Sequence, residues 1–259
     1  MNSMATRMTR KGDRVIAVIP ARYGSTRFPG KPLALIAGKT MIEQVYRRAA
    51  AATYVDKVLV ATDDARIAAA VAGFGGDAVM TSSEHATGTD RIAEAMRGRD
   101  ADWVLNVQGD EPTLPPSVLD DLVRAMASAR CDMGTVAVPF GLTGRDPSDP
   151  NCVKVVVDGE SRALYFSRAQ VPFCRQGGTP VEPMLHWGLY AYRRDFLDKF
   201  VSWPRGQLET CEMLEQLRAV EKGVRILVVK ASVPSVGVDV PADIPLVEEM
   251  LRREAKGAA

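Results

Sequence analysis

The sequence predicts a three-layer α/β fold with a mainly parallel central sheet. In the first half of the chain, short runs rich in β-branched residues alternate with stretches of helical pattern. The predicted strands cover residues 15–19, 57–61, 103–107 and 134–138, and the predicted helices lie near 40–52, 64–73, 88–97 and 116–128. Alternation at this spacing indicates βαβ units, in which helices cover the faces of a parallel sheet.

Local signals mark where the predicted helices begin. Thr40 is expected to cap the first helix, with Glu43 three residues later as its capping-box partner. Asp63 and Asp64 directly follow the second strand, and we expect both to cap the next helix.

The pattern changes near residue 140, where a loop rich in Gly, Pro and Asp begins. Shorter strands are predicted at 153–157, 163–166 and 188–192, and they are expected to be antiparallel where the turns between them are tight. They are followed by a continuous helix at 208–222, a strand at 226–230 and a closing helix at 241–254. We expect a disordered leader at 1–14 and one domain over 15–259, with an inserted edge sheet at about 140–205.

Composition excludes several classes of protein. The 259 residues are 46% hydrophobic and 25% charged, with 33 basic against 32 acidic side chains, so no general field for binding nucleic acid exists. No apolar run approaches the roughly 18 residues of a membrane helix. Without an export signal, the four scattered cysteines are expected to be reduced, mostly buried thiols in the cytoplasm. With two histidines in the chain, a zinc site is not expected.

The loop after the first strand carries three cations, Arg22, Arg27 and Lys31, among Gly, Ser, Thr and Pro residues. Ligands of α/β proteins bind outside the carboxyl ends of the strands, where backbone N–H groups and cations can hold phosphate. A solvated basic loop would explain the same residues. Because the loop does not match a Walker A motif, any phosphate binding here is of another kind.

Two further segments place carboxylates at strand ends. Asp110 follows the third predicted strand, and the neighbouring Gly109 permits close backbone approach. Asp239 lies between the last strand and the closing helix, which begins at Pro241. Together the two carboxylates could hold Mg²⁺ for phosphoryl chemistry. A turn at Asp110 and a helix cap at Asp239 are the simpler alternatives.

Other candidates are weaker when each is taken alone. The turn at residues 87–91 could contact a nucleobase or simply cap a helix. A dispersed group could bind an acidic polyol: Arg168, His186, Tyr190, Glu212, Glu215 and Gln216. The alternative for His186 is a core histidine, and for Glu212 and Glu215 it is a solvated helix face.

These motifs, taken together, resemble the 3-deoxy-manno-octulosonate cytidylyltransferase family, the CMP-Kdo synthetases. The resemblance runs from Val15 to about Arg252. It rests on IPAR at 19–22, RFPGKP at 27–32, ATD at 61–63, TGTDR at 87–91, NVQGDEP at 106–112, ALYFSRA at 163–169, LE at 208–209 with EMLEQLR at 212–218, and GVD at 237–239.

The resemblance implies a Rossmann-like nucleotidyltransferase fold with an inserted dimerisation sheet, and a cytoplasmic homodimer. It implies Mg²⁺-dependent activation of Kdo by CTP, which supplies CMP-Kdo for lipopolysaccharide and releases pyrophosphate. By similarity, the catalytic residues are Arg22, Lys31 and Asp110; the metal ligands are Asp110 and Asp239; and the substrate-binding residues are Ala21, Arg27, Thr87, Gly88, Thr89, Arg91, Gln108, Arg168, His186, Tyr190, Glu215 and Gln216. The expected partners are CTP and Kdo, without nucleic acid or membrane.

Three alternatives stay open. A sister enzyme could activate 8-amino-Kdo, or another sugar acid such as a sialic acid, with nearly the same core. A non-catalytic nucleotide-binding domain could share the fold, although it would have no need of Asp110 and Asp239.

Overall fold

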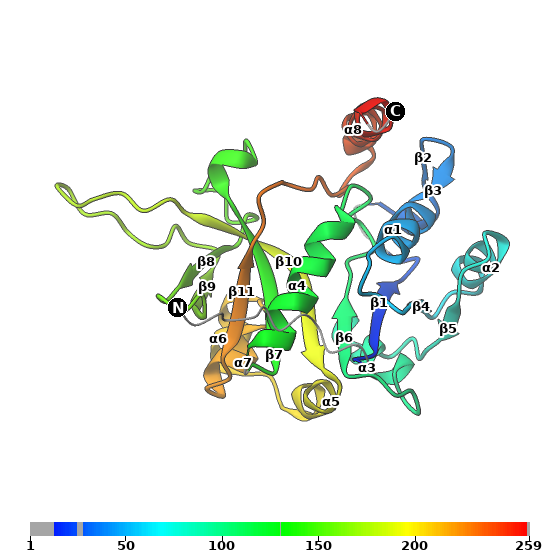
Figure 1. The fold of residues 1–259 in the computed structure, drawn as a ribbon, viewed down its shortest axis with the longest axis horizontal. Helices are drawn as coiled ribbons and strands as arrows, with labels where there is room; N and C mark the ends of the chain where they lie inside the picture. The colour runs from blue at the N-terminus through cyan, green and yellow to red at the C-terminus, as the bar shows by residue number, and fades with distance from the viewer. Residues whose placement is uncertain (1–12, 25–27, 130, 258–259) are drawn as a thin grey trace, which may run out of the picture. The chain divides into compact units, whose positions relative to one another are not determined.

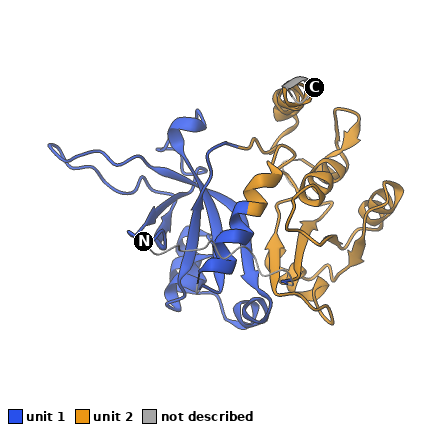
Figure 2. Cartoon of the chain, in the orientation of Figure 1, with its two compact units in different colours: residues 1–13, 121–234 blue, residues 14–120, 235–259 orange. Residues whose placement is uncertain are grey.

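The computed structural model describes residues 13–24, 28–129 and 131–257, and it divides into two compact units (Figures 1 and 2). Unit 2 consists of residues 14–120 and 235–259, and unit 1 of residues 1–13 and 121–234. The predicted insertion at 140–205 therefore lies within unit 1. The predicted leader lies, except for its last two residues, outside the described residues, as does Arg27.

Unit 2 is built on four parallel strands in the order β6-β1-β4-β5. These strands are β1 (Val15–Ala21), β4 (Lys57–Thr62), β5 (Ala78–Met80) and β6 (Trp103–Asn106). In the register, Val18 of β1 pairs with Leu59 of β4 and with Asn106 of β6. Almost every residue of β1 is buried, as expected for a parallel strand covered on both faces.

Three helices connect these strands, and each begins close to its predicted start. They are α1 (Met41–Ala50), α2 (Ala65–Gly73) and α3 (Gly88–Ala95). Thr40 caps α1 as predicted, accepting from the N–H of Glu43 at 3.3 Å, whereas the Glu43 carboxylate accepts from Arg47. The prediction for the next helix is confirmed only for Asp64, which accepts from Arg66 N–H at 2.9 Å. Asp63 instead pairs with Arg91 at 3.0 Å.

The C-terminal segment completes unit 2. A short hairpin, β2 (Leu35–Ile36) and β3 (Lys39–Thr40), follows the 3₁₀ turn η1 (Lys31–Leu33). Helix α8 (Ile244–Gly257) packs beside it through a cluster centred on Ile36, Met41, Val238 and Val247. The closing helix was predicted to start at Pro241, but Pro241–Asp243 forms the 3₁₀ turn η3 and the α-helix begins after it. This packing attaches the chain around Asp239 to the segment that follows the first loop.

Unit 1 contains a mixed sheet. Its central strand β7 (Met133–Pro139) pairs parallel with β11 (Ile226–Lys230) and antiparallel with β10 (Met184–Arg193). β8 (Lys154–Val157) pairs antiparallel with β10 and with β9 (Ala163–Ser167), which confirms the predicted antiparallel pairing of the short strands. The other elements are η2 (Phe140–Leu142), α5 (Arg194–Ser202), α6 (Gln207–Glu212) and α7 (Leu217–Glu221), and α4 (Pro116–Ser128) carries the chain from unit 2 into unit 1.

The continuous helix predicted over 208–222 is wrong. The chain breaks between α6 and α7 because Met213 adopts the left-handed conformation, with φ of 53°. Arg218 then donates two hydrogen bonds to the Glu209 carboxylate, at 2.6 and 2.7 Å, and both side chains are buried. Apolar residues on two short helices therefore produced a pattern that resembled one long helix.

The cysteines depart from expectation in part. All four are free thiols, but only Cys131 and Cys152 are buried, whereas Cys174 and Cys211 are exposed. Among the described residues, no helix combines the length and apolar character needed to cross a membrane.

Candidate active site

A cavity of about 330 Å³ opens in unit 2 where strands β1 and β6 end. Because these neighbouring strands are parallel, the loops at their carboxyl ends meet at one edge of the sheet. The cavity is lined by predicted site residues from three separate segments: Ala21, Arg22 and Lys31; Thr87, Gly88 and Arg91; Gln108 and Asp110. Thr89 is not among the lining residues, since it is buried in the first turn of α3.

Lys31 is the charged centre of one end of the site. Its ammonium donates to the Asp110 carboxylate at 2.7 Å and lies 3.6 Å from the Asp239 carboxylate. The Lys31 side chain is only 12% exposed, whereas those of Asp110 and Asp239 are 38% and 56% exposed. The structure thus brings two carboxylates, which are far apart in sequence, around a single cation.

A hydrogen-bonded clasp joins the segments that carry the two carboxylates. Val238 N–H donates to the Asp110 carbonyl at 2.9 Å. The buried Thr113 hydroxyl accepts from Val236 N–H at 2.8 Å and contacts the Ser235 hydroxyl at 2.9 Å. This clasp fixes the spacing of Asp110 and Asp239.

Close backbone packing also explains two glycines of the site. A Cβ at Gly109 would lie 3.2 Å from the carbonyl oxygen of Pro20, at the end of β1. A Cβ at Gly237 would lie 3.1 Å from the Glu111 carboxylate. Both contacts are tighter than ordinary side-chain packing permits, so Gly109 permits the close approach predicted from its sequence.

Asp239 does not act as the helix cap that the sequence offered as its simpler explanation. The carboxylate of Asp243 caps this turn, accepting from the N–H groups of Asp239 and Val240 at 2.7 and 2.9 Å. The Asp239 carboxylate lies near the Lys31 ammonium, at 3.6 Å.

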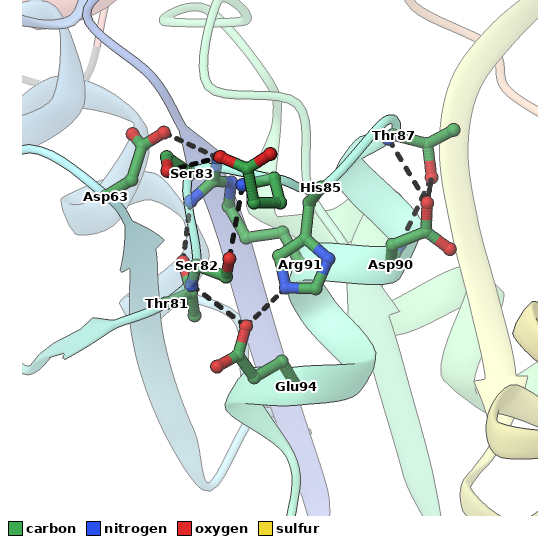
Figure 3. Close-up of polar contacts among 10 residues, drawn as sticks. Asp63, Thr81, Ser82, Ser83, His85, Thr87, Asp90, Arg91 and Glu94 are labelled. Atoms are coloured by element: carbon green, nitrogen blue, oxygen red, sulfur yellow. Dashed lines mark hydrogen bonds and ion pairs between the residues drawn. The ribbon is translucent and has the colours of Figure 1, made fainter.

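The other end of the cavity is formed by the turn that opens α3 (Figure 3). Thr87 and Asp90 form a full capping box, which confirms the helix-cap interpretation of this motif. Arg91 also lines the cavity. Its guanidinium donates to the Thr81 hydroxyl at 2.6 Å and to the Asp63 carboxylate at 3.0 Å. Thr87 and Gly88 line the cavity while they form this cap, so capping and ligand binding are compatible here.

Sequence reasoning missed His85, which lines the same cavity. Its ring Nε2 contacts the Glu94 carboxylate, which also accepts from Ser82 N–H at 3.0 Å (Figure 3). The available signal was the position of His85 two residues before the Thr87 cap. A lone histidine in a polar stretch carries no periodicity that would distinguish it from a surface residue.

Five of the predicted sugar-binding residues belong to unit 1: Arg168, His186, Tyr190, Glu215 and Gln216. The His186 ring contacts the rings of Phe166 and Tyr190, with centroid distances of 4.9 and 5.5 Å, and its Nε2 lies 3.0 Å from the Thr135 hydroxyl. Desolvation in this aromatic surrounding lowers the pKa of His186 to about 3, so the ring is neutral at neutral pH. Burial also raises the pKa of Tyr190, with smaller effects of Tyr192 and Glu215.

Glu212, Glu215 and Gln216 are also partly or fully buried. The interpretation of Glu212 and Glu215 as a solvated helix face is therefore wrong. Glu212 accepts from the Ser167 hydroxyl at 2.7 Å and from Arg168 N–H at 2.9 Å. Glu215 lies 3.6 Å from Arg218. The Gln216 amide nitrogen is buried, and no described group accepts a hydrogen bond from it.

Arg168, the fifth predicted sugar-binding residue, is engaged by the backbone of unit 1. Its guanidinium donates to the carbonyls of Glu212 at 2.8 Å and Pro150 at 3.0 Å. Its own carbonyl accepts from the fully buried Lys154 at 2.5 Å. These contacts hold two loops together, and the role of Arg168 toward a sugar stays a prediction.

No group of three or more potential metal-ligating side chains occurs among the described residues. The pair formed by Asp110 and Asp239 nevertheless fits Mg²⁺, which takes one or two carboxylates and completes its shell with water and phosphate oxygens. Both carboxylates already surround a cationic group, the Lys31 ammonium.

The parallel sheet and the cation-containing cavity at its strand ends are those of an α/β protein that binds an anionic ligand such as a phosphate group. The family model described as cytidylyltransferase matches residues 16–226, so the chain belongs to the cytidylyltransferase family. Its relatives include a 3-deoxy-manno-octulosonate cytidylyltransferase of Syntrophobacter fumaroxidans, 51% identical over 95% of this chain and 100% of the relative. The enzyme of the same name from Myxococcus xanthus is 51% identical over 92% of this chain and 97% of the relative.

Solved structures agree with this assignment. A CMP:2-keto-3-deoxy-manno-octonic acid synthetase complexed with CTP has a TM-score of 0.88 and 40% identity, covering 93% of this chain and 100% of that one. A 4-diphosphocytidyl-2C-methyl-D-erythritol synthase from Anaerococcus prevotii has a TM-score of 0.60 at 14% identity, covering 93% of this chain and 96% of the other. The second likeness concerns the fold alone. The predicted α/β nucleotidyltransferase fold and the predicted family are thus confirmed.

Proposed function

We propose that the chain transfers CMP from CTP to 3-deoxy-manno-octulosonate (Kdo), giving CMP-Kdo and pyrophosphate. The observation that carries this proposal is the cavity of unit 2, where Lys31 lies between Asp110 and Asp239 at the strand ends. Relatives that match this chain over nearly their whole length are named for the same reaction.

The reaction forms a bond between the anomeric oxygen of Kdo and the α-phosphorus of CTP. The bond from that phosphorus to the oxygen leading to the β-phosphorus breaks, pyrophosphate leaves, and the hydroxyl proton is released. Both the sugar carboxylate and the triphosphate are anionic, so neutralising charge and aligning the reactants are the main tasks of the protein.

In unit 2, we assign these tasks to the cations of the first loop. Arg22 and Lys31 would hold the triphosphate oxygens and stabilise the charge on departing pyrophosphate. Arg27 belongs to the same assignment, on its sequence position alone. The turn at residues 85–88 forms the other part of the cavity and would hold the base.

Asp110 and Asp239 would hold Mg²⁺ when the nucleotide enters. The ion would neutralise phosphate oxygens and polarise the α-phosphoryl group. The Lys31 ammonium, which pairs with both carboxylates in this structure, would then be free to bind phosphate instead.

We assign sugar binding to residues of unit 1, and Gln108 keeps its assignment from the sequence motif alone. Arg168 would supply a cation for the Kdo carboxylate. The ring of His186, which is neutral, would offer a hydrogen-bonding partner to a hydroxyl group. Further partners for hydroxyl groups would be Tyr190, Glu215 and Gln216. The buried amide of Gln216 supports this role, because a buried polar group without a partner costs stability unless a ligand satisfies it.

We further propose that the protein is a homodimer in the cytoplasm, and that its CMP-Kdo is used in lipopolysaccharide synthesis. The dimer is supported by exposed apolar side chains of unit 1, which a second copy would cover. Phe173 and Val181, which are 86% and 67% exposed, lie on the long loop that projects between β9 and β10, and Leu164 of β9 is 56% exposed (Figure 1).

Pyrophosphate release with CTP and Mg²⁺ tests the proposed reaction across Kdo, 8-amino-Kdo and a sialic acid. We expect the highest kcat/KM with Kdo. A clear preference for 8-amino-Kdo would establish the sister activity, and turnover with the sialic acid alone would refute the Kdo assignment. CTP binding without turnover of any sugar acid would instead favour a nucleotide-binding domain.

A further inference from the structure

The segment from Thr81 to Thr87 is fastened to helix α3 at both of its ends (Figure 3). At its start, the Thr81 hydroxyl accepts from the buried Arg91 guanidinium at 2.6 Å. At its end, Thr87 donates from its N–H and its hydroxyl to the Asp90 carboxylate, at 3.2 and 2.9 Å. The residues between these two ends need a further contact to keep a single conformation.

Glu94 holds the middle of the segment. A single oxygen of its carboxylate accepts from Ser82 N–H at 3.0 Å and contacts Nε2 of His85. The Ser82 N–H bond first, and the His85 contact second, lower the pKa of Glu94, so the carboxylate is ionised at neutral pH. Glu94 itself does not line the cavity, whereas His85 does. Glu94 can therefore affect a ligand only through His85 and the turn that follows it.

The contact with Glu94 also fixes the hydrogen-bonding role of Nε2 in His85. A carboxylate only accepts, so Nε2 carries the hydrogen in this pair. In the neutral ring, Nδ1 is then an acceptor. An acceptor at a base-binding turn suits the amino group of cytosine and not the carbonyl oxygen that uracil carries at the same position.

We propose that Glu94 is a positioning residue that orients His85 to recognise the cytosine amino group and thereby favours CTP over UTP. The inference rests on the proposed function, because it takes the cavity to be the nucleotide site. It gives a role to a carboxylate outside the cavity and to the histidine that sequence reasoning missed.

The test measures equilibrium binding of CTP and UTP, with Mg²⁺, to the full chain by calorimetry. The variants are E94A, H85A and the double variant, with E84A as the matched control. Glu84 is an exposed carboxylate of the same segment whose described side-chain contact is with Ser83. Circular dichroism and the melting temperature establish folding; E94Q replaces E94A, and H85Q replaces H85A, where the alanine variant fails to fold.

Removing one hydrogen-bonded partner should weaken CTP binding about 10-fold in E94A and in H85A. UTP binding should change less than about 2-fold, so the preference for CTP falls. CTP binding by the double variant should be as weak as in each single variant, because both substitutions remove the same contact between Glu94 and His85. The KM for Kdo and all properties of E84A should be unchanged.

Additive losses in the double variant, or equal losses for CTP and UTP, would overturn the inference. So would a wild-type chain that binds CTP and UTP equally well. A wild-type chain that binds neither nucleotide would overturn the proposed function itself, which separates the two failures.

Discussion

The candidate binding groups of the two units are held in different ways. In unit 2, charged side chains lie along an open cavity, and Lys31, Asp110 and Asp239 pair with one another. In unit 1, Gln216 is buried, the partly exposed His186 packs against aromatic rings, and Arg168 donates to backbone carbonyls. Under the proposed function, unit 2 would bind the nucleotide by exchanging ion pairs for a charged ligand, whereas unit 1 would bind the sugar through largely fixed hydrogen-bonding groups. The predictions below test this contrast, beginning with the largest expected effect.

Asp110→Asn should reduce kcat by about 10²–10³-fold, because it removes a charge that is proposed to hold Mg²⁺ beside the reacting phosphate. The melting temperature should change little, since Asp110 is partly exposed and its main partner is Lys31. Pyrophosphate release at saturating Mg²⁺ measures the effect. D121N, which alters an exposed carboxylate paired with Arg124, is the control. Near-normal turnover of D110N would remove Asp110 from the metal site.

Lys31→Ala should weaken CTP binding about 10–100-fold, because a charge-assisted contact with phosphate is lost. The KM for Kdo should rise much less. K39A, which removes an exposed lysine of β3, serves as the control for charge alone. Equal losses for both substrates would indicate damage to the fold rather than to the triphosphate site.

Arg168→Lys should raise the KM for Kdo about 10-fold and leave CTP binding unchanged, because an ammonium cannot reproduce a guanidinium fork. R205K provides a comparison at an exposed arginine, which lies 3.9 Å from Glu209. Steady-state kinetics with each substrate varied in turn separates the two constants. If the melting temperature falls and the KM for Kdo is unchanged, Arg168 only joins the loops of unit 1.

His186 should make unit 1 less stable as the pH falls. Its folded pKa of about 3 lies below the unfolded value of 6.5, so the unfolded state binds more protons between these two values. Stability is therefore complete above pH 6.5 and is lost below it, by about 1 kcal/mol at pH 5.5. Melting temperatures of wild type and H186N between pH 7.5 and 5.5 measure the difference, and the variant should show the flatter dependence. Identical slopes would mean that the pKa of His186 is the same in the folded and unfolded chain.

Most of unit 2 was predictable because the sequence signals of its elements are local. The apolar run of β1 and the small, cationic loop after it are contiguous, and parallel strands bring their carboxyl ends to one edge. Thr40 and Asp64 cap helices through bonds that span only a few residues. Such features depend on nearby residues and therefore leave a pattern in the sequence.

Predictions failed where distant partners decide the local structure. The pairing of Arg218 with Glu209 accompanies the break at Met213, which the apolar pattern across 208–222 conceals. Asp63 is used by Arg91 rather than by the helix beside it. His85 gains its significance from Glu94, nine residues later and on another element.

The sequence by itself determined the α/β fold class, the order of most strands and helices, and the residue types that can bind a triphosphate. Hydrophobic periodicity and capping chemistry act over a few residues, so each segment encodes them directly. Only the tertiary structure decided that Asp110 and Asp239 share Lys31, that Glu94 reaches His85, and that Glu212 and Glu215 are partly buried. These outcomes depend on which side chains meet after packing, and a buried charge or hydrogen-bonding group must find its partner there, wherever in the chain that partner lies.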